Sequence, residues 1–253
     1  MSETRELRVG HLYGSLLNLY GDRGNILTLK YRCEQRGIGF VVEDIGLGKT
    51  FEPSGYDLLF VGGGPDREQQ RVADDLVDLK AVPLREAADS GQVILAVCGG
   101  YQLLGHYYRE AGGEELPGAG VLDLHTEHPG DQARRCIGNI IARWDEGMIV
   151  GFENHGGRTR LGPTAQPLAT VEVGYGNNGE DDLEGARQGN VFGTYIHGSL
   201  LPKNPAFADY LIGLALSRRY GEEPLAPLDD SLELRARAVA EGIARREHRR
   251  KSA

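Results

Sequence analysis

Residues 93–105, VILAVCGGYQLLG, run through apolar side chains to Cys98, continue with two glycines and then show a helix-like pattern. A short, continuously apolar run is typical of a strand buried on both faces, and the residues after Gly100 predict a helix. A turn between such a strand and such a helix lifts its residue above the edge of a sheet. The stretch therefore predicts an α/β fold and places Cys98 at the end of a strand.

Further apolar runs lie on both sides of this stretch. They predict strands over residues 7–13, 38–45, 56–64 and 190–198. Helical spacing covers residues 24–37 and 67–90, and we expect Pro83 to break or kink the second helix because proline removes a backbone hydrogen bond. Continuously apolar strands that alternate with helices predict a mostly parallel central sheet flanked by helices.

The later part of the chain has a different pattern. Between about 118 and 195, short apolar runs are separated by Gly, Pro and Asn, which predicts added antiparallel or mixed strands. Two helical stretches follow, at about 205–219 and 231–248. The 253 residues contain neither an internal repeat nor a long linker, so we expect one domain over 1–253.

Charge and hydropathy narrow the class of protein. The formal net charge of -9 disfavours general nucleic-acid binding, because phosphate contacts need a positive surface. Basic residues cluster in RREHRRKSA (245–253), for which a solvated helix end and a nucleic-acid patch are alternatives. No apolar run reaches 18 residues, and the N-terminus MSETRELRVG is too charged for a signal peptide. We therefore expect a cytoplasmic protein without direct membrane insertion.

The cysteines are Cys33, Cys98 and Cys136, an odd number without CxxC spacing. This arrangement predicts neither a disulfide framework nor a zinc site, so we expect no metal in this chain. Cys98 has two interpretations. It is either a buried core thiol or a nucleophile on a strained turn, whose small neighbours leave room for a substrate. In the second case the following helix favours the thiolate, and the N–H of Gly99 stabilises an oxyanion.

A nucleophilic thiol needs a base, and His197 at the end of an apolar strand is the best candidate. A structural histidine is the alternative interpretation of His197, and His155 is a competing base. The glycines at 62–64 follow another strand, so Gly63 or Gly64 can supply a second oxyanion donor, unless the three glycines form only a tight turn.

These motifs together resemble a known family. CGGYQLLG after a strand, the distal GTYIHG and the upstream VGGGPDREQ are similar to class I glutamine amidotransferases of the CobB/CobQ-like branch. The stretches LLNLYGDRGNI (16–26), GFENHGGRT (151–159), GYGNN (174–178) and YIHGSLLPKNP (195–205) resemble the GatD family within that branch. The resemblance covers about residues 7–220. It implies a flavodoxin-like amidotransferase core followed by a helical extension at about 221–253.

The resemblance implies roles for individual residues. Cys98 matches the nucleophile that attacks the side-chain amide of L-glutamine, and His197 matches the general acid/base. Gly99 and the turn with Gly63 and Gly64 match the oxyanion hole. The family also holds its substrate with an arginine in the segment that is HPGDQARRCIGN (128–139) here. Spacing favours Arg135 over the adjacent Arg134, and a guanidinium suits the carboxylate of glutamine.

One position departs from the wider class. Many class I amidotransferases carry a glutamate two residues after the histidine, where this chain has Ser199. The site is then a Cys–His dyad, or a carboxylate arrives from elsewhere. Asp22 and Glu153 are the candidates for this orienting residue. Asp22 is alternatively a helix cap and Glu153 a surface charge at a strand end.

The chain contains no G-x-x-x-x-G-K-[ST] loop, and we expect GLGKT (46–50) to be a surface loop. We therefore expect no cofactor here, and ATP and Mg²⁺ on a partner. By resemblance, that partner is a MurT-like Mur-ligase subunit that amidates D-glutamate of lipid II, which would bring a heterodimer near the inner face of the membrane. The alternatives are a subunit for cobyrinate-type amidation and a non-catalytic scaffold on the same fold.

Overall fold

The computed structural model describes residues 5–251, so the ends of the charged N-terminus and of the basic C-terminus lie outside the described residues. Its centre is a six-stranded sheet with the order β13-β14-β4-β3-β1-β2. All neighbouring strands are parallel except β13 and β14. The strands are β1 (Glu6–Leu12), β2 (Gly39–Ile45), β3 (Leu58–Val61), β4 (Val93–Val97), β13 (Ala186–Gln188) and β14 (Val191–Thr194).

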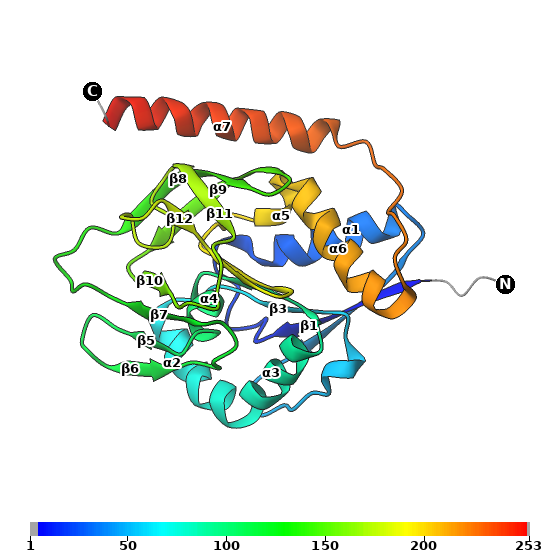
Figure 1. Cartoon of the computed structure of the whole chain (residues 1–253), viewed down its shortest axis with the longest axis horizontal. Helices are drawn as coiled ribbons and strands as arrows, with labels where there is room; N and C mark the ends of the chain where they lie inside the picture. Colours follow the sequence, from blue (N-terminus) through cyan, green and yellow to red (C-terminus); the bar gives the residue numbers. More distant parts are fainter. Residues whose placement is uncertain (1–4, 252–253) are drawn as a thin grey trace.

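Helices cover both faces of this sheet (Figure 1). One face carries α1 (Arg23–Glu34), α5 (Leu200–Lys203) and α6 (Pro205–Tyr220), and the other carries α2 (Asp66–Asp75) and α3 (Ala81–Asp89). The central strands β3, β4 and β14 are buried along their whole length. This burial on two faces explains their continuously apolar sequences. The predicted parallel sheet with flanking helices is confirmed.

The helical region before β4 differs from the expectation at Pro83. A five-residue π-helical segment (Leu76–Lys80) separates α2 from α3, and α3 continues through Pro83. Proline lacks the N–H that would bond to the carbonyl four residues earlier, and a π-turn just before it accommodates that loss. The helix is therefore irregular before the proline and does not break at it.

Two smaller sheets occupy the middle of the chain, as its short apolar runs predict. One has the order β10-β7-β5-β6 and the other β12-β11-β8-β9, and both are antiparallel except for the β5–β7 pair. The first comprises β5 (Tyr107–Arg109), β6 (Glu115–Pro117), β7 (Leu124–Glu127) and β10 (Arg158–Leu161). The second comprises β8 (Cys136–Trp144), β9 (Gly147–His155), β11 (Ala169–Val173) and β12 (Leu183–Glu184).

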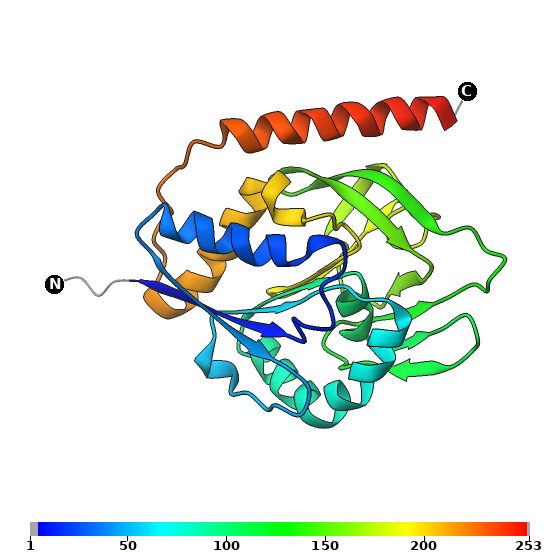
Figure 2. The same ribbon diagram turned by 180° about the vertical axis from the view of Figure 1, so that it is seen from behind.

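The chain ends in a long helix, α7 (Ser231–Lys251), that lies along the outside of the molecule (Figures 1 and 2). Its Ala244 is buried against Ile141, Val150 and Val173 of the β12-β11-β8-β9 sheet. Within the described residues, no helix is long and apolar enough to span a membrane.

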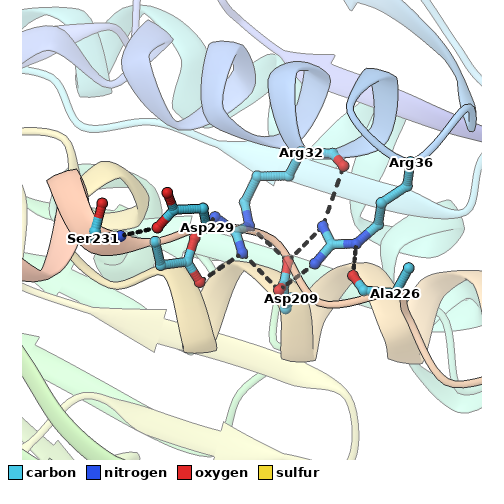
Figure 3. Close-up of polar contacts among 7 residues, drawn as sticks. Arg32, Arg36, Asp209, Ala226, Asp229 and Ser231 are labelled. Atoms are coloured by element: carbon cyan, nitrogen blue, oxygen red, sulfur yellow. Dashed lines mark hydrogen bonds and ion pairs between the residues drawn. The ribbon is translucent and has the colours of Figure 1, made fainter.

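Arg32 of α1 and Arg36, two residues after the end of that helix, tie the segment before α7 to the core (Figure 3). Arg32 is 1% exposed and forms ion pairs with Asp209 at 2.6 Å and with Asp230 at 2.7 Å. Arg36 pairs with Asp209 at 2.6 Å and donates a hydrogen bond to the carbonyl of Ala226. These contacts of Arg32 and Arg36, which we call the clamp, therefore join α1, α6 and the start of α7.

Candidate active site

Cys98 occupies the sharp turn between β4 and the short helix α4 (Gly99–Leu103). Its φ is +51° and its ψ is -109°, a strained backbone conformation for a residue with a side chain. A backbone hydrogen bond from Cys98 N to Thr194 O, 2.8 Å long, continues the pairing of β4 with β14 past the end of β4. The strand–turn–helix predicted around Cys98 is present.

The glycines after Cys98 have a steric reason. A Cβ atom at Gly99 would lie 2.9 Å from the carbonyl oxygen of Gly64, and one at Gly100 would lie 2.7 Å from that of Gly62. The first turn of α4 thus packs directly on the turn that follows β3. Because no side chain fits between them, the two glycine-rich strand ends approach closely, as the sequence suggested.

A cavity of about 200 Å³ opens beside the thiol. Its wall includes Gly64, Gln69, Cys98, Arg135 and His155. The cavity lies at the carboxyl ends of β3 and β4, where ligands bind in open parallel sheets. A thiol, a glycine turn and a guanidinium therefore share one small enclosure.

The resting state of Cys98 differs from the sequence expectation of a thiolate. Cys98 is 8% exposed. Burial and, to a lesser degree, the nearby carboxyl group of Asp22 raise the pKa of the thiol to about 12, while the N–H of Gly99 and the charge of Arg135 oppose the rise. The five-residue helix α4 does not overcome the desolvation of the sulfur. A base must therefore remove the proton when the thiol reacts.

The turn at 62–64 offers one of its two candidate donors to the site. The N–H of Gly63 donates a 2.6 Å hydrogen bond to Oδ2 of Asp22. Gly64 lines the cavity, and its carbonyl accepts a hydrogen bond from Nε2 of Gln69. The N–H groups of Gly64 and Gly99 are thus the pair that the geometry favours for an oxyanion.

His197 lies near the same edge of the sheet, three residues after β14, which is shorter than the predicted strand over 190–198. Its backbone pairs with Phe152 of β9 through two hydrogen bonds of 2.9 and 3.2 Å. The side chain is 1% exposed, and burial together with the charge of Lys203 lowers its pKa to about 4. His197 is therefore neutral at physiological pH, which is the form that accepts a proton.

His155, the competing base, lines the cavity itself. Its Nδ1 lies 2.8 Å from the carbonyl oxygen of Gly157, so that nitrogen carries the proton in the neutral ring. Burial lowers the pKa of His155 to about 3. Within the part of the chain that the structure describes, its Nε2 makes no hydrogen bond.

The two adjacent arginines point to different places. Arg135 lines the cavity with Cys98 and donates a 3.1 Å hydrogen bond from Nε to the side-chain oxygen of Asn154. Arg134 lines a separate cavity against α7, and its carbonyl accepts a hydrogen bond from Arg158. The geometry thus favours Arg135 as the ligand for a substrate carboxylate.

Comparison with known proteins identifies the family of this chain. The model of the CobB/CobQ-like glutamine amidotransferase domain matches residues 8–205. The chain belongs to this family. The family and the fold class predicted from the sequence are confirmed.

Three relatives show which members of the family this chain is similar to. The chain is 43% identical to the "Lipid II isoglutaminyl synthase (glutamine-hydrolyzing) subunit GatD" of Streptococcus pneumoniae, over 88% of this chain and 85% of that protein. Identity to the subunit of the same name from Staphylococcus aureus is 42%, over 92% and 94% of the two chains. A probable cobyric acid synthase of Methanothermobacter thermautotrophicus is 33% identical, over 70% of this chain and 35% of that protein.

Solved structures show the same fold at lower identity. A crystal structure titled as a glutamine amidotransferase superposes with a TM-score of 0.55 and 19% identity, over 82% of this chain and 98% of that chain. A glutamine amidotransferase of Thermotoga maritima gives a TM-score of 0.51 at 17% identity, over 93% and 94%. These likenesses support the fold alone.

Asp22 and Glu153, the two carboxylates that the sequence offers for orienting the histidine of this CobB/CobQ-like chain, are both fully buried. Asp22 stands at the start of α1, but its side chain makes no capping hydrogen bond and turns to Gly63 instead. Glu153 accepts hydrogen bonds from the backbone N–H groups of Tyr175 (2.7 Å) and Gly176 (2.9 Å). Neither the cap proposed for Asp22 nor the surface charge proposed for Glu153 is correct.

The sequence did not predict a buried polar network that begins in the cavity wall at Gln69 and Gln102. Gln69 bonds to Gln102, Gln102 bonds to the hydroxyl of Tyr195, and that hydroxyl lies 2.6 Å from Oγ1 of Thr159. The members come from four separate segments of the chain. Their only sequence signal is polar side chains beside the CGG and GGG motifs, which is too general to identify a network.

Proposed function

We propose that this chain is the glutamine-hydrolysing subunit of a lipid II isoglutaminyl synthase. The observation that carries the proposal is Cys98 on a strained turn, lining a cavity together with Gly64 and Arg135. Membership of the amidotransferase family, and two relatives of that name at 42–43% identity over most of their length, support the same activity.

The reaction starts with glutamine held by its α-carboxylate on Arg135. His197 accepts the proton of the Cys98 thiol as the sulfur attacks the side-chain amide carbon. The carbonyl oxygen becomes an oxyanion and receives hydrogen bonds from the N–H groups of Gly64 and Gly99. Protonated His197 then gives its proton to the departing nitrogen, so ammonia leaves and a γ-glutamyl thioester remains on Cys98.

Water completes the cycle. His197 takes a proton from a water molecule that attacks the thioester carbon, and the same two N–H groups stabilise the second oxyanion. The C–S bond breaks, the sulfur recovers a proton from His197, and glutamate leaves. Each donor of the pair contributes on the order of 10²–10³ in rate.

The released ammonia requires an activated acceptor. We assign that step to a MurT-like ligase subunit that binds ATP and Mg²⁺ and activates the α-carboxyl group of D-glutamate in lipid II. The two subunits would form a cytoplasmic heterodimer close to the inner face of the membrane, where the acceptor lies. This chain itself needs no cofactor for glutamine hydrolysis.

Likeness to cobyric acid synthases favours a second candidate, a subunit for cobyrinate-type amidation. The partner separates the two candidates. Co-purification with a Mur-ligase-like protein, and amidation of lipid II that depends on both ATP and glutamine, support the cell-wall function. Co-purification with a corrinoid-binding ATPase would reject it.

The central test is ammonia release from glutamine by Cys98→Ala and Cys98→Ser. Both variants should lose the activity, since no other thiol lines the cavity. Cys33→Ala, on α1 and away from the cavity, is the matched control and should keep it. Full glutaminase activity in a folded Cys98 variant would reject Cys98 as the nucleophile, whereas a wild-type chain without glutaminase activity would favour the scaffold alternative.

A further inference from the structure

The segment before α1 cradles the glycine turn that follows β3. A Cβ atom at Gly62 would lie 2.1 Å from the carbonyl oxygen of Leu17, and one at Gly64 would lie 2.5 Å from Cδ2 of the same leucine. The backbone N–H of Leu19 donates a 2.9 Å hydrogen bond to the carbonyl oxygen of Gly63. The position of the turn is therefore set by residues more than forty positions away in the sequence.

These contacts determine the orientation of the peptide between Gly63 and Gly64. In a trans peptide the C=O of one residue and the N–H of the next point in opposite directions. Because the carbonyl of Gly63 points at Leu19, the N–H of Gly64 points away from that segment. A flip of this peptide would break the bond to Leu19 and turn a carbonyl toward the cavity, where an oxyanion would be repelled.

Asp22 holds the other polar group of Gly63. Its Oδ2 accepts the N–H of Gly63 at 2.6 Å, so both backbone groups of this glycine are bonded to the segment before α1. A Cβ atom at Gly63 would lie 3.0 Å from Cβ of Cys98 and 3.3 Å from Oδ2 of Asp22. The carboxyl group of Asp22 and the side chain of Cys98 thus both lie directly beside Gly63.

The surroundings of Asp22 suit a neutral acid better than a carboxylate. The residue is 0% exposed, and no ion pair within residues 5–251 involves it. Its Oδ1 has no hydrogen-bond partner among the described residues. A buried charge with one hydrogen bond and no counter-ion is costly, and protonation removes that cost.

We propose that Asp22 is a positioning residue that fixes the oxyanion-binding peptide of Gly63 and Gly64, and that it does so in its protonated, neutral form. This inference rests on the proposed glutaminase function. A neutral carboxyl group still accepts the N–H of Gly63 through its carbonyl oxygen. It also leaves no second negative charge beside the sulfur when the thiolate and then the oxyanion form.

The electrostatic surroundings of Asp22 and Cys98 agree with a neutral Asp22. Burial raises the pKa of Asp22 to about 7, and the hydrogen bond from Gly63 opposes the rise only in part. At the thiol of Cys98, the charges of Asp22 and Asp66 disfavour the thiolate and the charge of Arg135 favours it. Of the two charges that disfavour the thiolate, that of Asp22 has the larger effect, and a neutral Asp22 removes it.

The test compares Asp22→Asn with Asp22→Ala in the full chain. Asparagine keeps the acceptor oxygen without charge, so its kcat for glutamine should stay within about threefold of wild type, and alanine removes the anchor. Asp22→Ala should lose on the order of 10²–10³ in kcat, the cost of one oxyanion donor, with KM little changed because Arg135 still holds the substrate. Asp74→Asn, exposed on α2, controls for the loss of one carboxyl group.

Backbone hydrogen exchange of the Gly63 amide, followed by NMR, supplies a readout that needs no activity. The amide should be protected in wild type and Asp22→Asn and exchange at least tenfold faster in Asp22→Ala. Loss of kcat in Asp22→Asn with the amide still protected would overturn the neutral form, and full kcat with unchanged protection in Asp22→Ala would overturn the anchor. If wild type does not hydrolyse glutamine, the proposed function fails, while the exchange still decides whether Asp22 holds the turn.

Discussion

The imidazole of His155 lies flat against the phenol ring of Tyr195, with ring centroids 3.6 Å apart and planes 8° apart. The hydroxyl of Tyr195 in turn bonds to Gln102 and Thr159. His155 is therefore held by a stacked ring on one side and by the carbonyl of Gly157 at Nδ1. This immobilised histidine forms a wall of the cavity, and His197 is the proton carrier in the mechanism that we propose.

The two histidines should respond differently to substitution. His197→Ala should lower kcat for glutamine hydrolysis by about 10²–10⁴, the usual contribution of a general base. His155→Phe keeps a ring to stack on Tyr195, so it should lower kcat by less than about tenfold. Steady-state ammonia release measures both. A reversed order, with His155→Phe inactive and His197→Ala active, would assign the base to His155.

The adjacent arginines provide a matched pair for substrate binding. Arg135→Ala should raise KM for glutamine about 10- to 100-fold, because a hydrogen-bonded charge on the substrate carboxylate contributes about 1.5–3 kcal/mol. Arg134→Ala removes the same charge from the neighbouring cavity and should leave KM within about twofold. Equal effects of both substitutions would mean that only the overall charge of this segment matters.

The sequence located Cys98 because strand, turn and helix are all local to it. It left Gly63 and Gly64 as equal candidates, because the interaction that separates them comes from Asp22, 41 residues earlier in the chain. The expectation that Cys98 rests as a thiolate was wrong for a related reason. A helix N-terminus is visible in a sequence, but the desolvation of a sulfur depends on residues that only the folded chain brings around it.

The raised pKa of the Cys98 thiol predicts slow alkylation at neutral pH. Burial of the sulfur is the main cause of the shift to about 12, so the thiolate fraction rises about tenfold for each pH unit below that value. The rate of iodoacetamide labelling at Cys98, mapped by peptide mass spectrometry, should therefore increase about tenfold per unit between pH 7 and 9. A rate that is already constant above pH 7 would mean a preformed thiolate.

The clamp at Arg32 should contribute strongly to stability. Arg32→Ala leaves Asp230 without its buried cation and Asp209 with Arg36 alone, and breaking such a pair costs up to about 3–5 kcal/mol. Urea unfolding measures the loss. Arg8→Ala removes an exposed pair with Glu6 and should cost less than about 1 kcal/mol. Similar losses in the two variants would mean that the burial of Arg32 adds nothing.

The two buried histidines should each lower stability in mild acid, while the buried carboxyl groups of Asp22 and Glu184, whose pKa values burial raises to about 7, act in the opposite direction. Burial lowers the pKa of His155 to about 3 and, with the charge of Lys203, that of His197 to about 4, against 6.5 for the unperturbed group. Between about pH 4 and 6.5 these two histidines therefore bind more protons in the unfolded chain than in the folded one. The contribution of the two neutral histidines to the free energy of unfolding is fully present above pH 6.5 and decreases as the pH falls through this window.

Each histidine should remove about 1.4 kcal/mol of unfolding free energy per pH unit in that window. Urea unfolding at a series of pH values gives the slope for wild type. His155→Phe keeps the stacked ring but removes one titrating group, so its slope should be about 1.4 kcal/mol per pH unit smaller. An unchanged slope would mean that His155 takes up its proton in the folded chain as easily as in the unfolded one. The description of His155 as a neutral ring held against Tyr195 would then be wrong.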